Sequence, residues 1–431
     1  MSQSPPTSPV VASDLAAQID AAAQAAEARL IAWRRDFHAN PELGNREFRT
    51  AGIVAEHLRA LGFDEVRTGV AHTGVVGLLK GGLPGPVVAL RADMDALPVA
   101  EQVDLPFASK VKAEWNGEQV GVMHACGHDA HTAILMGVAE VLAGQRGALR
   151  GSVKFIFQPA EELPPEGEEG GAKMMIEEGA MENPRPAAIF GLHVISRLPL
   201  NVVGYRPGPT MASADNLKIT IQGSQTHGAM PWAGVDPIVV SAQVVLGLQT
   251  IISRQLDLTK EPAVLTIGTI HGGLRENIIP ESVEMRGTIR SFDEEMRDDM
   301  HERVTYLAQA IARGSRAGCE VCIKKNYPVT VNDPALTEAM RPTLARVAGP
   351  NRLALVPKVT GSEDFSFFQR VVPGLFIFLG VTPDEQDLSK AAPNHSPRFF
   401  VDERCLVTGV RALAHLAADY LQHGAAPPVP E

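Results

Sequence analysis

The chain has few cysteines and few basic residues for its length, and both shortages exclude classes of protein. Four cysteines in 431 residues are too few for a fold held together by disulfides. Because 39 basic residues face 50 acidic ones, the formal net charge is −11, which disfavours nucleic acid or an anionic membrane as a partner. No apolar run reaches the roughly 20 residues that span a bilayer. With 45% hydrophobic residues, the composition is typical of a soluble globular protein.

The first residues lack the basic stretch and apolar run that mark a signal peptide. We therefore expect residues 1–14 to be a disordered lead-in. We also expect a cytoplasmic protein, since an exported form would need a signal peptide outside the given sequence. Cys319 and Cys322 form a C-x-x-C pair in a strand-like segment. Residues three apart on a strand face opposite sides, so we expect two ordinary, mostly buried cysteines there.

The length of the chain exceeds what one ordinary core holds, which predicts two domains. Short apolar runs alternate with helical segments, and this predicts an α/β core with a largely parallel sheet. The runs cover residues 87–92, 119–123, 152–157, 187–192 and 374–380.

Between residues 206 and 326 the pattern changes to βαββαβ, which is typical of a ferredoxin-like α+β domain. We therefore predict a catalytic domain made of residues 15–205 and 327–431, interrupted by an inserted domain of residues 206–326.

Carboxylates, histidines and one cysteine follow the predicted strands. They are Asp93, Asp95, His124, Cys126, His128, Glu161, Glu162, His193 and His395. In open α/β sheets the ligand binds outside the carboxyl ends of the strands, where side chains far apart in sequence can meet. Cysteine thiolate and neutral imidazole bind borderline divalent metals well. The sequence therefore predicts a metallohydrolase.

Glu161 and Glu162 are adjacent, and two such carboxylates repel unless a positive charge compensates. A metal ion would do so, and would leave one glutamate as ligand and the other as general base. The alternative is a solvated acidic pair that opens the loop of residues 162–171. Asp93 and Asp95 could ligate a metal or orient a ligand histidine.

Two further histidines flank the Cys126–His128 pair. We expect His124 and His131 to be structural or to support ligands. We also expect Asp129 to cap the helix that carries His131.

A series of motifs runs along nearly the whole chain: RRDFHANPELGNRE, ALRADMDALPV, HACGHDAHTA, FQPAEE, GLHV, NIIPESVEMRGTIR, GSEDFSFF and PNHSPRFF. In these motifs the chain resembles the M20 metallopeptidases. Within that family it is most similar to the amidohydrolase branch of hippurate hydrolases, indole-acetyl-amino-acid hydrolases and N-acyl-amino-acid amidohydrolases. The resemblance implies two divalent metal ions per subunit, of zinc, manganese, cobalt or nickel. It also implies a homodimer or higher homo-oligomer, with the inserted domain as lid and dimerisation domain.

The resemblance further implies roles for single residues. The implied metal ligands are Cys126, His128, Glu162, His193 and His395. Glu161 would be the general base on a metal-bound water. His227 would reach the site of the neighbouring subunit and stabilise the oxyanion, while Asn277 and Arg290 would bind the substrate carbonyl and carboxylate.

The function implied is hydrolysis of N-acyl amino acids, or related amides, to a carboxylic acid and a free amino acid. We keep two alternatives: a dipeptidase, carboxypeptidase-like hydrolase or esterase at the same centre, and a non-catalytic relative that binds a small acylated ligand.

Overall fold

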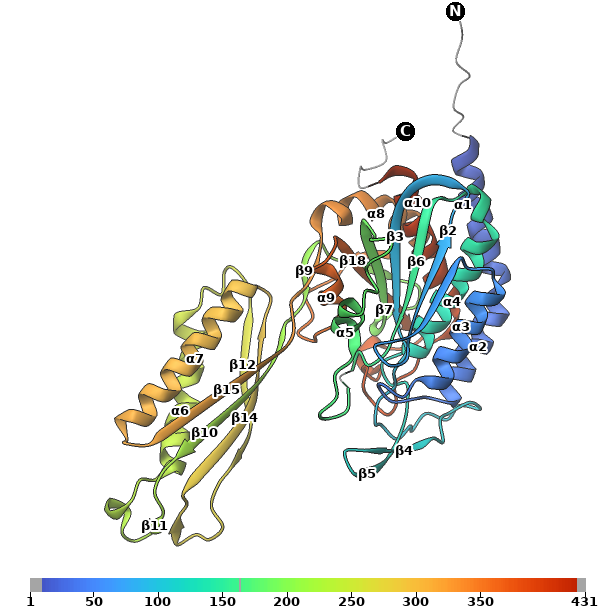
Figure 1. The fold of residues 1–431 in the computed structure, drawn as a ribbon. Coiled ribbons are helices and arrows are strands. Elements are labelled where there is room, and N and C mark those ends of the chain that lie inside the picture. The colour runs from blue at the N-terminus through green and yellow to red at the C-terminus, as the bar shows by residue number, and fades with distance from the viewer. Residues whose placement is uncertain (1–9, 163, 425–431) are drawn as a thin grey trace, which may run out of the picture. The chain divides into compact units, whose positions relative to one another are not determined.

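The computed structural model describes residues 10–162 and 164–424, with side chains from residue 15 onward. The chain forms two compact units, which Figure 1 draws as ribbons. The first consists of Met1–Gly208, Asn332–Val356 and Phe367–Glu431, and the second of Pro209–Val331 and Pro357–Ser366. The segment Pro357–Ser366 therefore belongs to the second unit, whereas the sequence assigned it to the catalytic domain.

The first unit is built on an eight-stranded sheet in the order β1-β2-β6-β3-β7-β18-β8-β17. The strands are β1 (Glu65–Val70), β2 (Gly74–Lys80), β3 (Leu83–Asp93), β6 (Arg150–Gln158), β7 (Ala188–Pro199), β8 (Val203–Tyr205), β17 (Leu353–Leu355) and β18 (Gly374–Thr382). The central strands β6, β3, β7 and β18 run parallel to one another, whereas β2 and β8, on either side of them, pair antiparallel with β6 and β18. The predicted α/β fold with a mostly parallel sheet is confirmed.

The apolar runs were visible in the sequence because the central strands are buried on both faces. All nine residues of β18 are buried, as are the last six of β3 and of β6. A strand covered on both sides reads as a continuous apolar run. The run at 119–123 is the exception: β5 (Glu118–Gly121) pairs in a hairpin with β4 (Lys112–Trp115), outside this sheet, so its placement in the core was wrong.

Helices α4 and α10 pack on β3 and helix α3 packs on β1 and β2, while α1 and α2 pack against α4 and α10 (Figure 1). These helices are α1 (Val10–Ala25), α2 (Glu27–Ala39), α3 (Phe48–Ala60), α4 (His128–Gly144) and α10 (Leu406–His423). Of the predicted disordered lead-in, residues 1–9 lie outside the described part of the chain. Residues 10–14 are helical, so α1 begins earlier than we expected. The first unit also contains α5 (Gly171–Glu177) and α8 (Pro334–Ala348), and α9 (Phe365–Gln369) crosses the boundary at Ser366 between the two units.

The second unit has a four-stranded antiparallel sheet in the order β12-β14-β10-β15, with α6 and α7 on one face (Figure 1). Its elements in chain order are β10 (Ala214–Gln222), α6 (Pro237–Thr250), β12 (Ala263–His271), β14 (Ser282–Ser291), α7 (Glu294–Gly314) and β15 (Gly318–Tyr327). This is the predicted βαββαβ order. Residues four apart on α7, including Met296, Met300 and Val304, are buried against the sheet, as expected of an amphipathic helix.

The two cysteines of β15 differ in exposure. Cys319 is half-buried and Cys322 is exposed, and both are free thiols. They face opposite sides of the strand, as predicted, but only one face of this sheet carries helices. The expectation that both are mostly buried is therefore wrong for Cys322.

By length and composition alone, one described helix could cross a membrane. It covers Pro237–Gln255, which is α6 and the π-helical turn Ile251–Gln255 that follows it. The expectation that no segment is long and apolar enough fails at this helix. Its residues Val240, Val244 and Leu248 are buried in the core of the second unit.

Two leucines of α6 allow a matched test of this core. Leu248 is fully buried, whereas Leu246 is 72% exposed. We expect Leu248→Ala to lower the free energy of unfolding by about 2–5 kcal/mol, because it leaves a cavity. Leu246→Ala should change it by less than about 0.5 kcal/mol. Urea unfolding of both variants measures the difference, and equal effects would contradict this packing of α6.

Candidate metal centre

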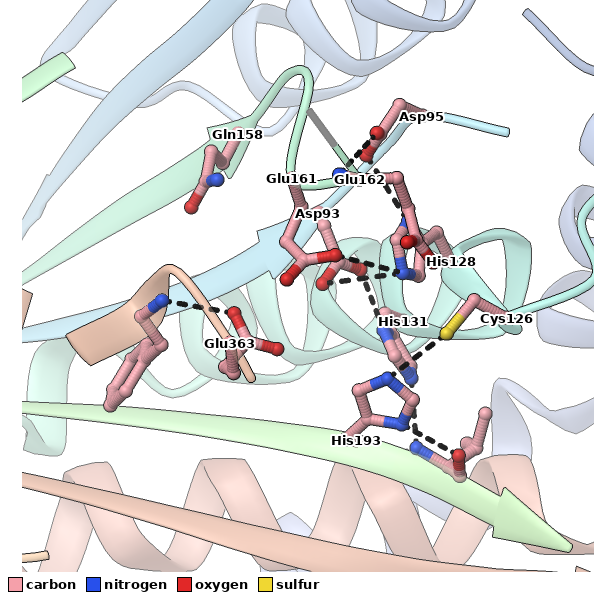
Figure 2. Close-up of polar contacts among 12 residues, drawn as sticks. Asp93, Asp95, Cys126, His128, His131, Gln158, Glu161, Glu162, His193 and Glu363 are labelled. Atoms are coloured by element: carbon pink, nitrogen blue, oxygen red, sulfur yellow. Dashed lines mark hydrogen bonds and ion pairs between the residues drawn. The ribbon is translucent and has the colours of Figure 1, made fainter. Parts of the chain in front are cut away.

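The predicted metal ligands Cys126, His128, Glu162 and His193 lie close together near the carboxyl ends of the central strands (Figure 2). Asp93 is the last residue of β3, and Glu161 and Glu162 follow the end of β6. His193 lies within β7, which continues to Pro199, and not on the loop after the strand as we expected. Cys126 lies just before α4 and His128 is the first residue of that helix.

The sulfur of Cys126 lies between two groups of possible ligand atoms. It is 3.3 Å from His193 Nε2 and 3.3 Å from His395 Nε2. His395 Nε2 is in turn 2.8 Å from Glu162 Oε1. The groups Cys126–His128–His193 and Cys126–Glu162–His395 each have their ligand atoms within 4.8 Å of one another. Ligand atoms around one tetrahedral ion, at bond lengths of about 2.0–2.3 Å, lie roughly 3.3–3.8 Å apart, so this spacing fits a metal ion.

Hydrogen bonds at the far side of two imidazoles leave the nitrogen that faces the cluster free. His193 Nδ1 donates to the carbonyl of Val194 at 2.7 Å, which leaves the lone pair of Nε2 directed at Cys126. His128 Nδ1 contacts Asp95 Oδ1 at 3.2 Å. His128 Nε2 is buried and has no hydrogen-bond partner among the described residues. Such support by an outer hydrogen bond is typical of histidines that bind metal.

His131 differs because both of its ring nitrogens are engaged. Nδ1 lies 2.6 Å from Asp93 Oδ1, and Nε2 accepts from the backbone N–H of Val194 at 2.8 Å. This ring therefore has no free lone pair for a metal ion, in line with the structural role we expected. His124 is buried and belongs to neither group of ligand atoms.

The electrostatics of the cluster favour an added positive charge. Burial lowers the pKa of His128, but Asp93 and Asp95 outweigh this effect and raise the pKa to about 10. Burial, reinforced by Glu162 and Glu161, raises the pKa of the Cys126 thiol well above its ordinary value. A divalent cation would offset the carboxylate charge and stabilise the thiolate. The donor set therefore fits a metal ion.

Asp95 and Asp93 support the proposed ligands through hydrogen bonds. One oxygen of Asp95 faces His128 Nδ1, and the other accepts from the backbone N–H of Glu162 at 2.9 Å. Asp93 accepts from Arg91 at 2.7 Å and contacts His131. Burial raises the pKa of Asp93, but the adjacent His128, His131 and Arg91 hold it well below its usual range.

Asn394, in the loop before α10, supports the centre and was not among the predicted site residues. Its Nδ2 donates to the backbone carbonyls of Cys126 and Val194, at 3.2 and 3.0 Å. The backbone N–H of His395 donates to Ala125 O at 2.8 Å. The only local signal is that Asn394 precedes a candidate ligand.

Asp129 does not cap α4. The helix begins after Gly127, without a side-chain cap. Asp129 Oδ2 instead lies 2.8 Å from both Arg34 Nε and His38 Nδ1, and all three side chains are buried. Our capping prediction is therefore wrong, because partners on α2 that are far away in sequence take up this carboxylate.

Three predicted site residues belong to the second unit. His227 is exposed on the short strand β11 (Thr226–His227), which pairs with β13 (Ile278–Ile279). The backbone N–H of Ala229 donates to His227 Nδ1 at 3.0 Å, so Nε2 carries the proton and can donate. The carbonyl of Asn277 accepts from Gly228 N–H at 2.8 Å, which brings Asn277 beside His227. Arg290, on β14, has a buried Nη1 without a hydrogen-bond partner among the described residues.

Known proteins resemble this chain over most of its length. The profile of Peptidase family M20/M25/M40 matches residues 89–419. The chain belongs to this family. The family predicted from the sequence is thus confirmed, and its members are hydrolases.

Thermostable carboxypeptidase 2 of Saccharolobus solfataricus is 42% identical over 91% of this chain and 95% of its own. N-acetylcysteine deacetylase of Bacillus subtilis is 36% identical over 91% of this chain and 97% of its own. A solved Bacillus subtilis structure, described as a dinuclear metal binding peptidase from the M20 family, is 36% identical. It covers 93% of this chain and 99% of its own, with a TM-score of 0.77.

The two interpretations of Asp129 differ in their consequence for stability. Asparagine caps helices as well as aspartate, so Asp129→Asn would be nearly neutral if Asp129 were a cap. Because it neutralises Arg34 in the core, we expect the change to cost about 3–5 kcal/mol. Asp333, which does cap α8 through Leu336 N–H, is the matched control. Asp333→Asn should cost less than about 0.5 kcal/mol, and urea unfolding compares the two. If both variants lowered the free energy of unfolding by the same small amount, Asp129 would act as a helix cap after all.

Proposed function

We propose that this protein is a metal-dependent amidohydrolase that cleaves N-acyl amino acids to a carboxylic acid and a free amino acid. The observation that carries the proposal is the position of Cys126 Sγ between two groups of ligand atoms, with the carboxylate of Glu161 beside them. The relative named as an N-acetylcysteine deacetylase supports this class of substrate.

Five side chains would hold two divalent cations, and they are Cys126, His128, Glu162, His193 and His395. A set of thiolate, imidazole and carboxylate ligands suits zinc, manganese, cobalt or nickel. The solved relative described as dinuclear supports two ions. Such ions, when bound, lower the pKa of water and polarise a carbonyl group.

Glu161 acts as the general base. Glu161 is buried and its carboxylate lies 3.9 Å from His128 Nε2, beside the proposed ligands but outside the set that surrounds Cys126. From this position it takes the proton of the attacking water and delivers it to the leaving amide nitrogen. Because bulk water has little access to a buried carboxylate, the proton passes to the leaving nitrogen and is not lost to solvent.

The second unit supplies the groups that recognise substrate, and acts as the lid and dimerisation domain. His227, with its proton on Nε2, donates to the developing oxyanion in the neighbouring subunit of a homodimer; one such donor is worth about 3 kcal/mol. Asn277 binds the substrate carbonyl. The unpaired Nη1 of Arg290 binds the carboxylate of the amino acid, for which a guanidinium is well shaped.

A carboxypeptidase is the second candidate, because a relative with that name is 42% identical. Both activities release an amino acid with a free carboxylate, so the same residues would serve either. In both cases the partners are small-molecule substrates, neither nucleic acid nor membrane, and we propose a cytoplasmic location.

The direct test measures the release of free amino acid from acetyl, benzoyl, arylacetyl and long-chain acyl amino acids, with dipeptides and esters in parallel. The protein is reconstituted separately with manganese, zinc, cobalt and nickel. We expect metal-dependent turnover of acyl amino acids, and loss of turnover when the substrate carboxylate is amidated. Preferred cleavage of peptides would favour the carboxypeptidase, and metal binding without any turnover would favour a ligand-binding protein.

Glu161→Gln tests the proposed base. The amide cannot accept the proton, so we expect kcat to fall by about 10²–10⁴-fold while metal content stays unchanged. Glu166→Gln, in the exposed acidic loop that follows, should leave both unchanged. Elemental analysis and initial rates measure the two quantities, and retained activity in Glu161→Gln would rule out the assignment.

A further inference from the structure

Glu47 is a fully buried carboxylate that holds the backbone beside the proposed base. It lies between α2 and α3 in the segment PELGNRE, to which the proposed mechanism gives no role. One oxygen accepts from the backbone N–H of Ala160 at 2.9 Å. The other lies 2.5 Å from the hydroxyl of Thr73. Ala160 directly precedes Glu161, so Glu47 contacts the loop that carries the base.

The helix next to Glu47 is capped by a different residue. Glu47 occupies the N-cap position of α3 but makes no side-chain capping bond. The carboxylate of Glu42 instead accepts from the N–H groups of Arg49 and Thr50, at 2.9 and 2.8 Å. Because Glu42 accepts the hydrogen bonds from the first turn of α3, the carboxylate of Glu47 can accept one from the loop after β6.

The backbone at Ala160 requires such a partner. Its φ angle is +50°, in the left-handed region that a residue with a Cβ atom rarely adopts. A conformation of this kind persists only where its surroundings impose it. On the other side of Glu161, the N–H of Glu162 donates to Asp95. A buried carboxylate thus fixes the peptide that precedes Ala160, and another fixes the peptide that follows Glu161.

The neighbours of Glu47 hold the far end of the same loop. Asn45 Nδ2 donates to Glu168 Oε2 and to the carbonyl of Glu169, both at 3.0 Å. Arg46 forms an ion pair with Glu168 at 2.5 Å. Residues 45–47 therefore contact the loop at both ends, and Glu47 makes the contact nearest the reacting group.

We infer that Glu47 is a positioning residue, which fixes Ala160 in its left-handed conformation and so directs the carboxylate of Glu161. The inference rests on the proposed role of Glu161 as base. Displacement of a catalytic group by about 1 Å can cost 10²-fold in rate, without affecting the groups that bind substrate or metal.

Three substitutions of Glu47 separate positioning from folding. Glu47→Ala removes the acceptor for Ala160 N–H, and Glu47→Asp withdraws it by one methylene while adding no bulk. Glu47→Gln keeps an acceptor for Ala160 and a group that can donate to Thr73. Burial and the nearby Asp95 raise the pKa of Glu47 to about 8, so glutamine also resembles the side chain at neutral pH. Glu178→Ala is the matched control, since Glu178 accepts from Ala71 N–H at 2.8 Å without touching the loop of Glu161.

We expect Glu47→Ala and Glu47→Asp to lower kcat by about 10²-fold, with KM and the metal content of the folded protein unchanged. Glu47→Gln and Glu178→Ala should keep nearly the full kcat. If Glu47→Ala does not fold, Glu47→Asp gives the result. A full kcat in Glu47→Asp, or a loss in Glu47→Gln equal to that in Glu47→Ala, would overturn the inference. So would parallel losses of kcat and metal, which indicate a purely structural role.

Hydrogen–deuterium exchange gives a readout that does not require activity. The backbone amides of Ala160, Glu161 and Glu162 should exchange faster in Glu47→Ala and Glu47→Asp than in the wild type and in Glu47→Gln. Unchanged exchange would overturn the positioning role even if kcat fell. A wild type that hydrolyses no amide on the panel would instead overturn the proposed function, and the catalytic role of Glu47 with it.

Discussion

The concentration of buried negative charge at the carboxyl end of the parallel sheet constrains the rest of the structure. Asp93, Asp95 and Glu161 are buried there with the Cys126 thiol, and Glu162 lies beside them. Carboxylates removed from water in this way repel one another and are costly without compensation. Arg91 neutralises Asp93, and the neutral ring of His131 donates a hydrogen bond to the same carboxylate. On the side of His128 Nε2 and His193 Nε2, divalent cations would offset the remaining negative charge of the carboxylates.

The surrounding elements hold this charge in a fixed arrangement through backbone contacts. Asp95 fixes the peptide of Glu162, Asn394 fixes the carbonyl of Cys126, and Glu47 fixes the peptide of Ala160. Side chains that are each held by a second set of residues are preorganised for binding or catalysis. The rigidity of the centre therefore comes from strand ends and loops that are far apart in the sequence.

The elements that could be predicted from the sequence are the strands that are buried on both faces of the sheet. β3, β6, β7 and β18 were recognisable because strands covered on both faces are continuously apolar, and their carboxyl ends located most of the candidate ligands. The same rule failed for the run at 119–123, because its first residues belong to the hairpin strand β5, which is half-exposed and lies outside the sheet. Within the site, the possible ligands were visible as residue types.

The residues that hold the site were harder to predict, since their role depends on contacts distant in sequence. Asp129 looks like a helix cap in its local sequence, but its partners Arg34 and His38 lie more than 90 positions away. Glu47 similarly has the position of a cap, and its partner Ala160 is 113 residues away. Neither contact leaves a local signal, because hydrophobic periodicity and capping patterns report only neighbouring residues.

Anomalous X-ray scattering from crystals loaded with manganese or zinc would locate the metal ions independently of any substrate. We expect two peaks, both within bonding distance of the cluster around Cys126 Sγ, with His128, His193, Glu162 and His395 as the other ligands. A single peak, or peaks bound by Asp93 and His131 in place of this set, would contradict this expectation.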